Sequence, residues 1–229
     1  MASINNNKEF YIYSTHKTAT QTLKSSFNTN HIHELKNINY TPQQFINDVK
    51  QYYKINNRKI KIITVLRTPS KRVISSYFQL NHDREIRMNK VNKHETTIMK
   101  NDIDYLISDI SNFIINEQYP SESLYEILKI FNFSINDIII REKYGFYENN
   151  IIELYVLDFD IITSKSKMKY LTDIFGDKAQ NYNTNKSDDK IYYNKYQIIK
   201  QHIGRTFEEM IDIKFSDIVV LKNKINPEK

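Results

Sequence analysis

Two segments of this chain share one pattern, a short apolar strand that ends in a basic turn and passes directly into a helix. Residues 10–27 (FYIYSTHKTATQTLKSSF) and residues 60–78 (IKIITVLRTPSKRVISSYF) both show it. Near-continuous apolar strands are typical of buried parallel sheets, and strands that alternate with helices predict helices on both sheet faces. The pattern therefore predicts an α/β fold whose ligand site lies at the carboxyl ends of the strands.

The rest of the chain continues the alternation and then becomes helical. Strands are expected at 9–14, 31–35, 59–66 and 153–158. Helices are expected at about 20–28, 41–55, 68–81, 102–116, 121–131, 163–175, 192–202 and 206–213. The polar segment 82–100 is expected to be a mobile or substrate-facing loop. We predict one domain over residues 1–229, with a central, mostly parallel sheet flanked by helices in three layers and a helical C-terminal part.

Composition limits the classes of function. The chain has 229 residues, a net charge of +6 and no cysteine, which excludes disulfides, thiolate catalysis and zinc–thiolate sites. The basic charge favours an anionic partner or simply reflects a lysine-rich solvated surface. No segment approaches the roughly 20 apolar residues of a membrane span, and no signal-like segment opens the sequence. A cytoplasmic protein without stable membrane insertion is expected.

The two strand ends carry groups that bind anions. A strand, a short loop and a helix start together aim backbone N–H groups at an anion. Lys17 adds a positive charge in the first turn, where three threonines add hydroxyl donors. Arg67 stands at the end of the second strand. Two such strand ends suggest a ligand with two phosphate-like groups.

The two segments resemble the sulfotransferases that use 3′-phosphoadenosine 5′-phosphosulfate (PAPS), especially the carbohydrate and glycosaminoglycan branch. HKTATQTL at 16–23 is similar to the family's 5′-phosphosulfate loop, although Ala19 and Thr20 replace its glycines and His16 a frequent proline. LRTPSKRVISSY at 66–77 is similar to the 3′-phosphate motif. The resemblance implies a P-loop-like fold. It also implies that PAPS is bound by Lys17, Thr18, Ala19, Thr20, Gln21, Thr22, Arg67 and Ser75, and by Lys186 in a weakly similar later loop.

The resemblance also suggests a general base for the acceptor hydroxyl. One branch of the family has a His-x-His pair after the first helix, and His31-Ile32-His33 lies at the matching place. Residues two apart on a strand share a face, so His33 is expected to be the base, with His31 as a helper or substrate contact. Both could instead be ordinary strand-end histidines. Other candidates for the base are Glu34, His82, Asp83 and Glu85.

The resemblance implies transfer of a sulfuryl group from PAPS to a hydroxyl of a carbohydrate or glycolipid acceptor, without a metal. Lys17 would stabilise the departing 3′-phosphoadenosine 5′-phosphate (PAP). One alternative is a nucleotide-dependent phosphotransferase, for which Asp158 is a candidate metal ligand, although the Walker A pattern is absent. Another is a nucleic-acid-binding protein, although no recognition motif or basic helix stands out. The basic residues of 82–100 would contact an anionic acceptor or simply form a solvated loop: Arg84, Arg87, Lys90 and Lys93.

Overall fold

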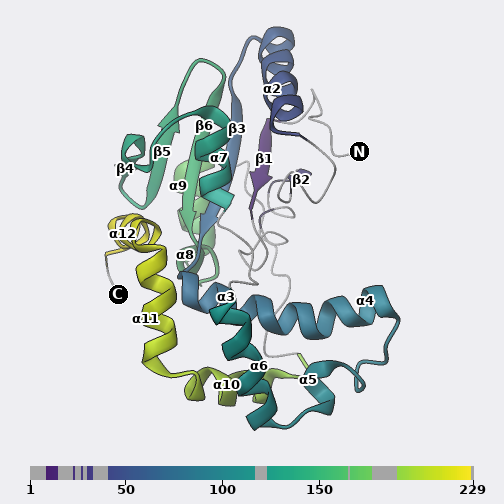
Figure 1. Ribbon diagram of the computed structural model, residues 1–229. Coiled ribbons are helices and arrows are strands. Elements are labelled where there is room, and N and C mark those ends of the chain that lie inside the picture. Colours follow the sequence, from purple (N-terminus) through teal and green to yellow (C-terminus); the bar gives the residue numbers. More distant parts are fainter. Residues whose placement is uncertain are drawn as a thin grey trace. The chain divides into compact units, whose positions relative to one another are not determined.

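The computed structural model describes residues 9–14, 23, 27, 30–32, 41–116, 123–164, 166–176 and 190–227 (Figure 1). The chain divides into two compact units. The first comprises residues 1–67, 121–184 and 220–229, and the second comprises 68–120 and 185–219. The prediction of one domain over residues 1–229 stays a prediction.

The first unit contains a six-stranded mixed sheet with the strand order β2-β1-β3-β6-β5-β4. Its strands are β1 (Phe10–Tyr13), β2 (Asn30–Ile32), β3 (Ile60–Leu66), β4 (Ile139–Arg141), β5 (Tyr144–Glu148) and β6 (Ile152–Asp158). The strands β2, β1, β3 and β6 run parallel, whereas β5 and β4 are antiparallel to their neighbours. The predicted α/β class with a mostly parallel central sheet is therefore confirmed, and the antiparallel hairpin at its edge was not predicted.

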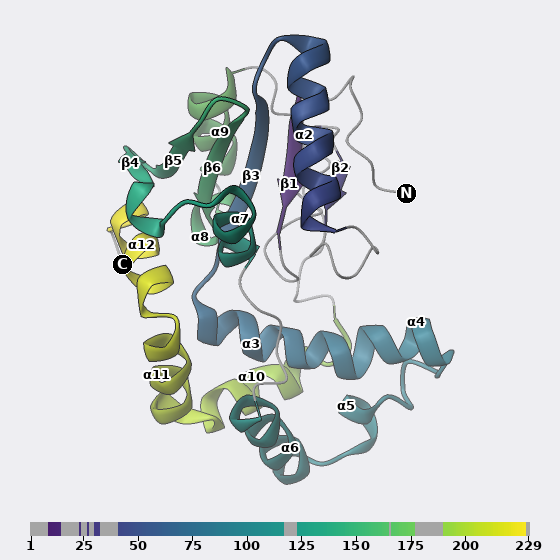
Figure 2. The same cartoon turned by 45° about the horizontal axis from the view of Figure 1, so that its top comes forward.

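Helices cover both faces of this sheet because the side chains of each strand alternate between the two faces. Tyr13 of β1 packs against Phe45 of α2 (Pro42–Asn56), and α7 (Ser123–Phe131) lies on the same face. Phe10 of the same strand packs against Phe175 of α9 (Lys167–Phe175) on the opposite face. Figure 2 shows α2 and α7 in front of the sheet and α9 behind it. The first unit therefore has three layers, as predicted.

The start of α2 follows from its sequence. Thr41 Oγ1 accepts a hydrogen bond from the Gln44 amide at 3.1 Å, and Gln44 Oε1 accepts one from the Thr41 amide at 2.8 Å. Pro42 occupies the first turn, where its missing N–H costs nothing. This reciprocal capping box satisfies two amides that would otherwise lack partners at the helix N-terminus.

All the regular elements that the structure describes in the second unit are helices. Its elements are α3 (Pro69–Phe78), the π-helix η2 (Gln79–Arg84), α4 (Glu85–Asn89), α5 (Thr97–Lys100), α6 (Ile103–Ile115), α10 (Tyr193–His202) and α11 (Gly204–Lys214). The helix that begins at Pro69 runs without a break to Asn89, and α5 covers Thr97–Lys100, so the prediction of a loop over 82–100 was wrong for 82–89 and for 97–100. His82 is buried, Asp83 and Glu85 are half-buried, and Arg84 and Arg87 are exposed, so a run of polar residues that is typical of a loop belongs to a helix here.

Three further elements were not expected. They are the 3-10 turn η3 (Ile135–Asp137), the one-turn helix α8 (Phe159–Ile162) and the helix α12 (Ser216–Ile225), which begins in the second unit and ends in the first. Among the helices that the structure describes, none is long and apolar enough to cross a membrane.

Candidate functional site

The carboxyl ends of β1, β3 and β6 lie at one edge of the first unit's sheet. β1 and β3 are parallel neighbours, with Ile12 opposite Ile63, while β2 lies on the other side of β1. The next parallel strand in the sequence therefore lies on one side of the β1–β3 pair for β1, which is followed by β2, and on the other side for β3, which is followed by β6. In open α/β sheets a ligand crevice forms at such a topological switch point. The two motif-bearing strands predicted from the sequence are thus adjacent and point the same way.

The end of β1 leads into the predicted phosphosulfate loop. Tyr13 and Ser14 are fully buried. Leu23 and Phe27 are both helical, Leu23 is fully buried, and the Phe27 ring stacks on Phe10 with the ring centres 5.3 Å apart. The helical residues after the loop are therefore packed onto the sheet that precedes it. The predicted site residues of the loop lie outside the described residues: Lys17, Thr18, Ala19, Thr20, Gln21 and Thr22.

Arg67 follows the last residue of β3 and is partly exposed. Its guanidinium carbon lies 4.5 Å from the centre of the Phe159 ring, the first residue of α8 after the neighbouring strand β6. Stacking on an aromatic face orders a guanidinium, and an ordered guanidinium can bind a phosphate group through two hydrogen bonds. Phe159 is a site residue that the sequence analysis missed, since only the pairing of β3 with β6 brings it beside Arg67.

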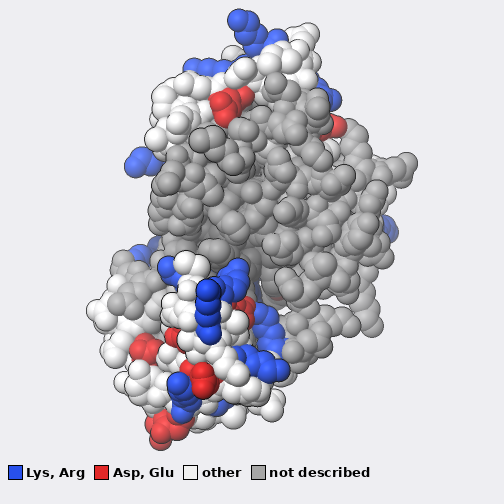
Figure 3. Space-filling model, turned by 90° about the vertical axis from the view of Figure 1, so that its right-hand side faces the viewer, with Lys and Arg blue, Asp and Glu red and all other residues white. Residues whose placement is uncertain are grey.

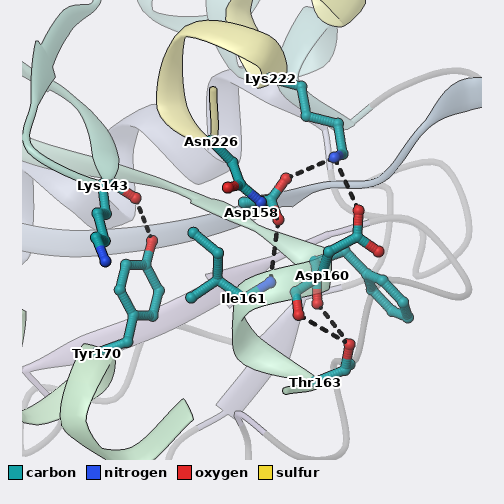
Figure 4. Close-up of polar contacts among 9 residues, drawn as sticks. Lys143, Asp158, Asp160, Ile161, Thr163, Tyr170, Lys222 and Asn226 are labelled. Atoms are coloured by element: carbon teal, nitrogen blue, oxygen red, sulfur yellow. Dashed lines mark hydrogen bonds and ion pairs between the residues drawn. The ribbon is translucent and has the colours of Figure 1, made fainter. Parts of the chain in front are cut away.

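Asp158, the last residue of β6, is fully buried and held by three groups (Figure 4). Its Oδ2 lies 2.8 Å from Lys222 Nζ, and its Oδ1 accepts hydrogen bonds from Asn226 Nδ2 at 3.2 Å and from the Ile161 amide at 3.0 Å. The same ammonium contacts Asp160 at 2.9 Å. Through these contacts Asp158 fastens α12 to the sheet and caps α8, so both of its oxygens have structural roles.

Electrostatics favours the charged form of this lysine. Burial lowers the pKa of Lys222, but its hydrogen bonds and charge interactions with Asp158 and Asp160 outweigh burial and hold the pKa above its ordinary value. Nearby, Tyr170 donates a hydrogen bond to the Lys143 carbonyl at 2.6 Å (Figure 4), and burial raises the pKa of this phenol. The side-chain contacts at the end of β6 therefore stabilise the fold.

The expected histidine base can be placed only in part. His31 belongs to β2, where its backbone lies opposite Ile12 of β1. His33 and the alternative base Glu34 lie outside the described residues, as does Lys186. The strand predicted over 31–35 is confirmed for residues 31–32, since β2 is Asn30–Ile32 and residues 33–35 lie outside the described residues.

The alternative base His82 is a buried residue of the second unit. Its Nδ1 shares a hydrogen bond of 2.7 Å with Thr96 Oγ1, and its ring packs edge-on against Tyr192 at 4.8 Å. Burial lowers the pKa of this imidazole. These contacts make His82 a packed, hydrogen-bonded core residue.

The two alternative carboxylate bases are also engaged. Asp83 pairs with Lys190, and Glu85 accepts hydrogen bonds from Thr97 N at 2.7 Å and Thr97 Oγ1 at 2.6 Å. Each contact joins η2 or α4 to another segment of the second unit. Both side chains therefore have evident structural roles.

The helix after Arg67 is capped by a residue that is distant in the sequence. Thr68 makes no side-chain cap, and Asp212 of α11 instead accepts hydrogen bonds from Ser70 N at 3.0 Å and Ser70 Oγ at 3.1 Å. A carboxylate therefore occupies the N-terminus of α3, where an anionic ligand would otherwise be favoured. Ser75, predicted to bind the 3′-phosphate, is a partly buried residue of α3.

Within the described part of the chain, no three His, Asp or Glu side chains form a cluster that could hold a metal ion. Comparisons with protein-family models, with curated proteins and with solved structures found no significant match.

Proposed function

We propose that this protein is a PAPS-dependent sulfotransferase with a P-loop-like first unit, which transfers a sulfuryl group to a hydroxyl of a carbohydrate or glycolipid. The observation that carries the proposal is the parallel adjacency of β1 and β3, because Lys17 follows β1 in the sequence and Arg67 directly follows β3. PAPS has phosphate groups on both sides of its ribose. Two neighbouring strand ends with one cation each match that separation of charge.

Sulfuryl transfer requires that the acceptor hydroxyl is positioned next to the sulfur atom and that the charge on the leaving phosphate is stabilised. In the proposed reaction the acceptor oxygen bonds to sulfur while the bond from sulfur to the bridging oxygen breaks. Lys17 stabilises the negative charge that develops on the departing phosphate. His33 accepts the proton of the acceptor hydroxyl, and His31 assists it. The substitution Lys17→Ala should abolish turnover. The variant His33→Ala should also lose turnover but should retain its affinity for PAP.

The phosphotransferase alternative is weakened by the contacts of Asp158. This candidate metal ligand is fully buried, forms an ion pair with Lys222 and accepts hydrogen bonds from Asn226 and a backbone amide. Metal binding there would require breaking a buried ion pair, which is costly. No contact among the described residues favours a nucleic-acid-binding function.

Calorimetric titration with PAP tests the proposal, with ATP and ADP as controls. We expect PAP to bind with micromolar affinity and ATP to bind weakly. Arg67→Ala should reduce PAP affinity about 10- to 100-fold, because charge-assisted hydrogen bonds to a phosphate are lost. Arg141→Ala is the matched control, since Arg141 also lies over a ring, 3.9 Å from the centre of Phe146, but at the exposed edge strand β4.

Two outcomes would overturn the assignment. If PAP and ADP bind equally, the 3′-phosphate is not recognised and the proposed donor is wrong. If Arg67→Ala and Arg141→Ala weaken PAP binding to the same extent, the effect reflects net charge, and Arg67 has no specific role.

A further inference from the structure

The second unit contains a cavity of about 570 Å³ that the proposed function does not use. It lies between one face of the continuous helix α3–η2–α4 and the helix α6. The residues that define its chemistry are Tyr77, Asn81, Arg84, Glu85, Asp109 and Phe113. Its volume is in the range of small-molecule sites.

Helical spacing explains why these side chains meet. Asn81 lies four residues after Tyr77, and Arg84 and Glu85 lie three and four residues after Asn81, so all four line the cavity from one side of the helix. The segment includes the π-helix η2, an irregularity that occurs frequently at functional sites. On the facing helix α6, Asp109 and Phe113 are four residues apart, so these two lining residues also lie on one helix face.

The inner end of the cavity is aromatic and rigid. Tyr77 and Phe113 pack with their ring centres 5.5 Å apart, and both are buried. The Tyr77 hydroxyl donates a hydrogen bond to Asp109 Oδ2 at 2.6 Å, which fixes that carboxylate. Burial and this carboxylate raise the pKa of the phenol, so it stays a donor at neutral pH. Apolar ring atoms here could contact the C–H face of a ligand ring.

The outer part of the cavity combines donors and acceptors. Arg84 is exposed, and none of the ion pairs or hydrogen bonds between described residues involves its guanidinium. The Asn81 amide both donates and accepts, while Asp109 and Glu85 accept. One cation and two carboxylates suit neither a strongly anionic nor a strongly cationic ligand. They suit hydroxyl groups, each of which donates to a carboxylate and accepts from a guanidinium.

We propose that this cavity binds an uncharged sugar ring, with Tyr77 and Phe113 at its apolar end and with Arg84 and Asp109 as the main hydrogen-bonding groups. Its role as the site of the sulfuryl acceptor would rest on the proposed function, whereas the binding itself does not. The exposed cations Arg87, Lys90 and Lys93 follow on the same segment, and Figure 3 shows Lys and Arg side chains gathered over this part of the surface. They lie outside the cavity lining.

Saturation-transfer NMR without PAP tests the proposal on the full chain. The probes are glucose, galactose, mannose, N-acetylglucosamine and their β-linked tetrasaccharides, with citrate and heparin tetrasaccharide as anionic comparisons. At least one neutral sugar should bind. Arg84→Gln should weaken that binding about tenfold, because a charged donor is lost. Asp109→Asn should have a similar effect while it still accepts the hydrogen bond from Tyr77.

Arg87→Gln is the matched control, since it removes an equal charge from the same helix but does not line the cavity. Equal weakening by Arg87→Gln and Arg84→Gln would overturn the proposal in favour of diffuse attraction. Binding of only the anionic probes, or of none of the neutral sugars, would also overturn it. Because PAP is absent, these outcomes are independent of whether the protein binds PAP.

Discussion

The neighbouring parallel strands β3 and β6 each lead to a charged residue, Arg67 directly after β3 and Asp158 at the end of β6, and the surroundings of the two charges differ. Asp158 at the end of β6 is fully buried and is paired with Lys222. Arg67, one residue beyond Leu66, which is the register partner of Asp158, is partly exposed and lies over the Phe159 ring. One sheet edge therefore holds a charge that serves the fold and a charge that remains accessible to solvent.

This difference separates stability from ligand binding. A buried ion pair has already lost its hydration, so removing one partner leaves an uncompensated charge in the interior. A partly exposed guanidinium on a ring contributes much less to stability. Substitutions at the two strand ends should therefore affect different measurements.

The largest expected effect is that of Lys222→Met, which keeps an apolar side chain but leaves Asp158 without its cation. We expect the free energy of unfolding, measured by urea denaturation, to fall by about 3–5 kcal/mol. Lys224→Met in the same helix is the control, and because Lys224 is exposed its effect should stay within about 0.5 kcal/mol. A loss below about 1 kcal/mol for Lys222→Met would show that the ion pair does not hold α12.

Arg67→Ala should lower the free energy of unfolding by only about 1 kcal/mol, the approximate value of a cation–π contact at a partly exposed site. Arg141→Ala should cost about the same, since its guanidinium also lies over a ring. Urea denaturation of both variants, compared with their affinities for PAP, tests the contrast. A loss of several kcal/mol for Arg67→Ala alone would make Arg67 a second structural charge.

Elements with local determinants could be predicted from the sequence. The start of α2 depends on Thr41, Pro42 and Gln44, which are nearly adjacent, and the prediction was correct to within a residue. The apolar run of β3 likewise predicted a buried parallel strand without any knowledge of its neighbours.

Elements that depend on distant partners could not be predicted. In the hairpin β4–β5, a Cβ added at Gly145 would lie 2.8 Å from Ile138 Cγ2 and 3.2 Å from Val156 Cβ. The glycine is thus required by packing and does not mark a turn. The same applies to the candidate site, because Lys222 meets Asp158 from 64 residues away, a pairing that no local pattern reveals.

The helices α2 and α3 allow a finer comparison between a helix that is capped by its own N-terminal residue and one that is capped by a residue distant in the sequence. Thr41 caps its own helix, whereas α3, which also begins Thr-Pro, is capped by Asp212 of α11. Thr41→Ala and Asp212→Ala should each lower the free energy of unfolding by about 1 kcal/mol, and Thr68→Ala should have almost no effect. Thermal and urea unfolding of the three variants would measure this. Equal losses for Thr68→Ala and Asp212→Ala would contradict capping by Asp212.

The smallest expected effect is on the pH dependence of stability and concerns His82, a buried side chain that the fold keeps neutral. Burial lowers the pKa of His82 below its ordinary 6.5 and, together with Lys190, outweighs the opposing carboxylates Asp83 and Glu85. Above about pH 6.5 the imidazole is neutral in both the folded and the unfolded state and contributes no pH dependence.

As the pH falls below that value, the unfolded chain takes up the proton first, so the free energy of unfolding should decrease until the folded-state pKa is passed. His82→Gln removes this proton uptake, and its stability should fall less than that of the wild type between pH 7 and pH 5. Urea denaturation at half-unit pH steps measures the difference. A steeper decline for His82→Gln than for the wild type would mean that the folded protein favours the imidazolium. His82 would then be a buried charged residue, as Asp158 is.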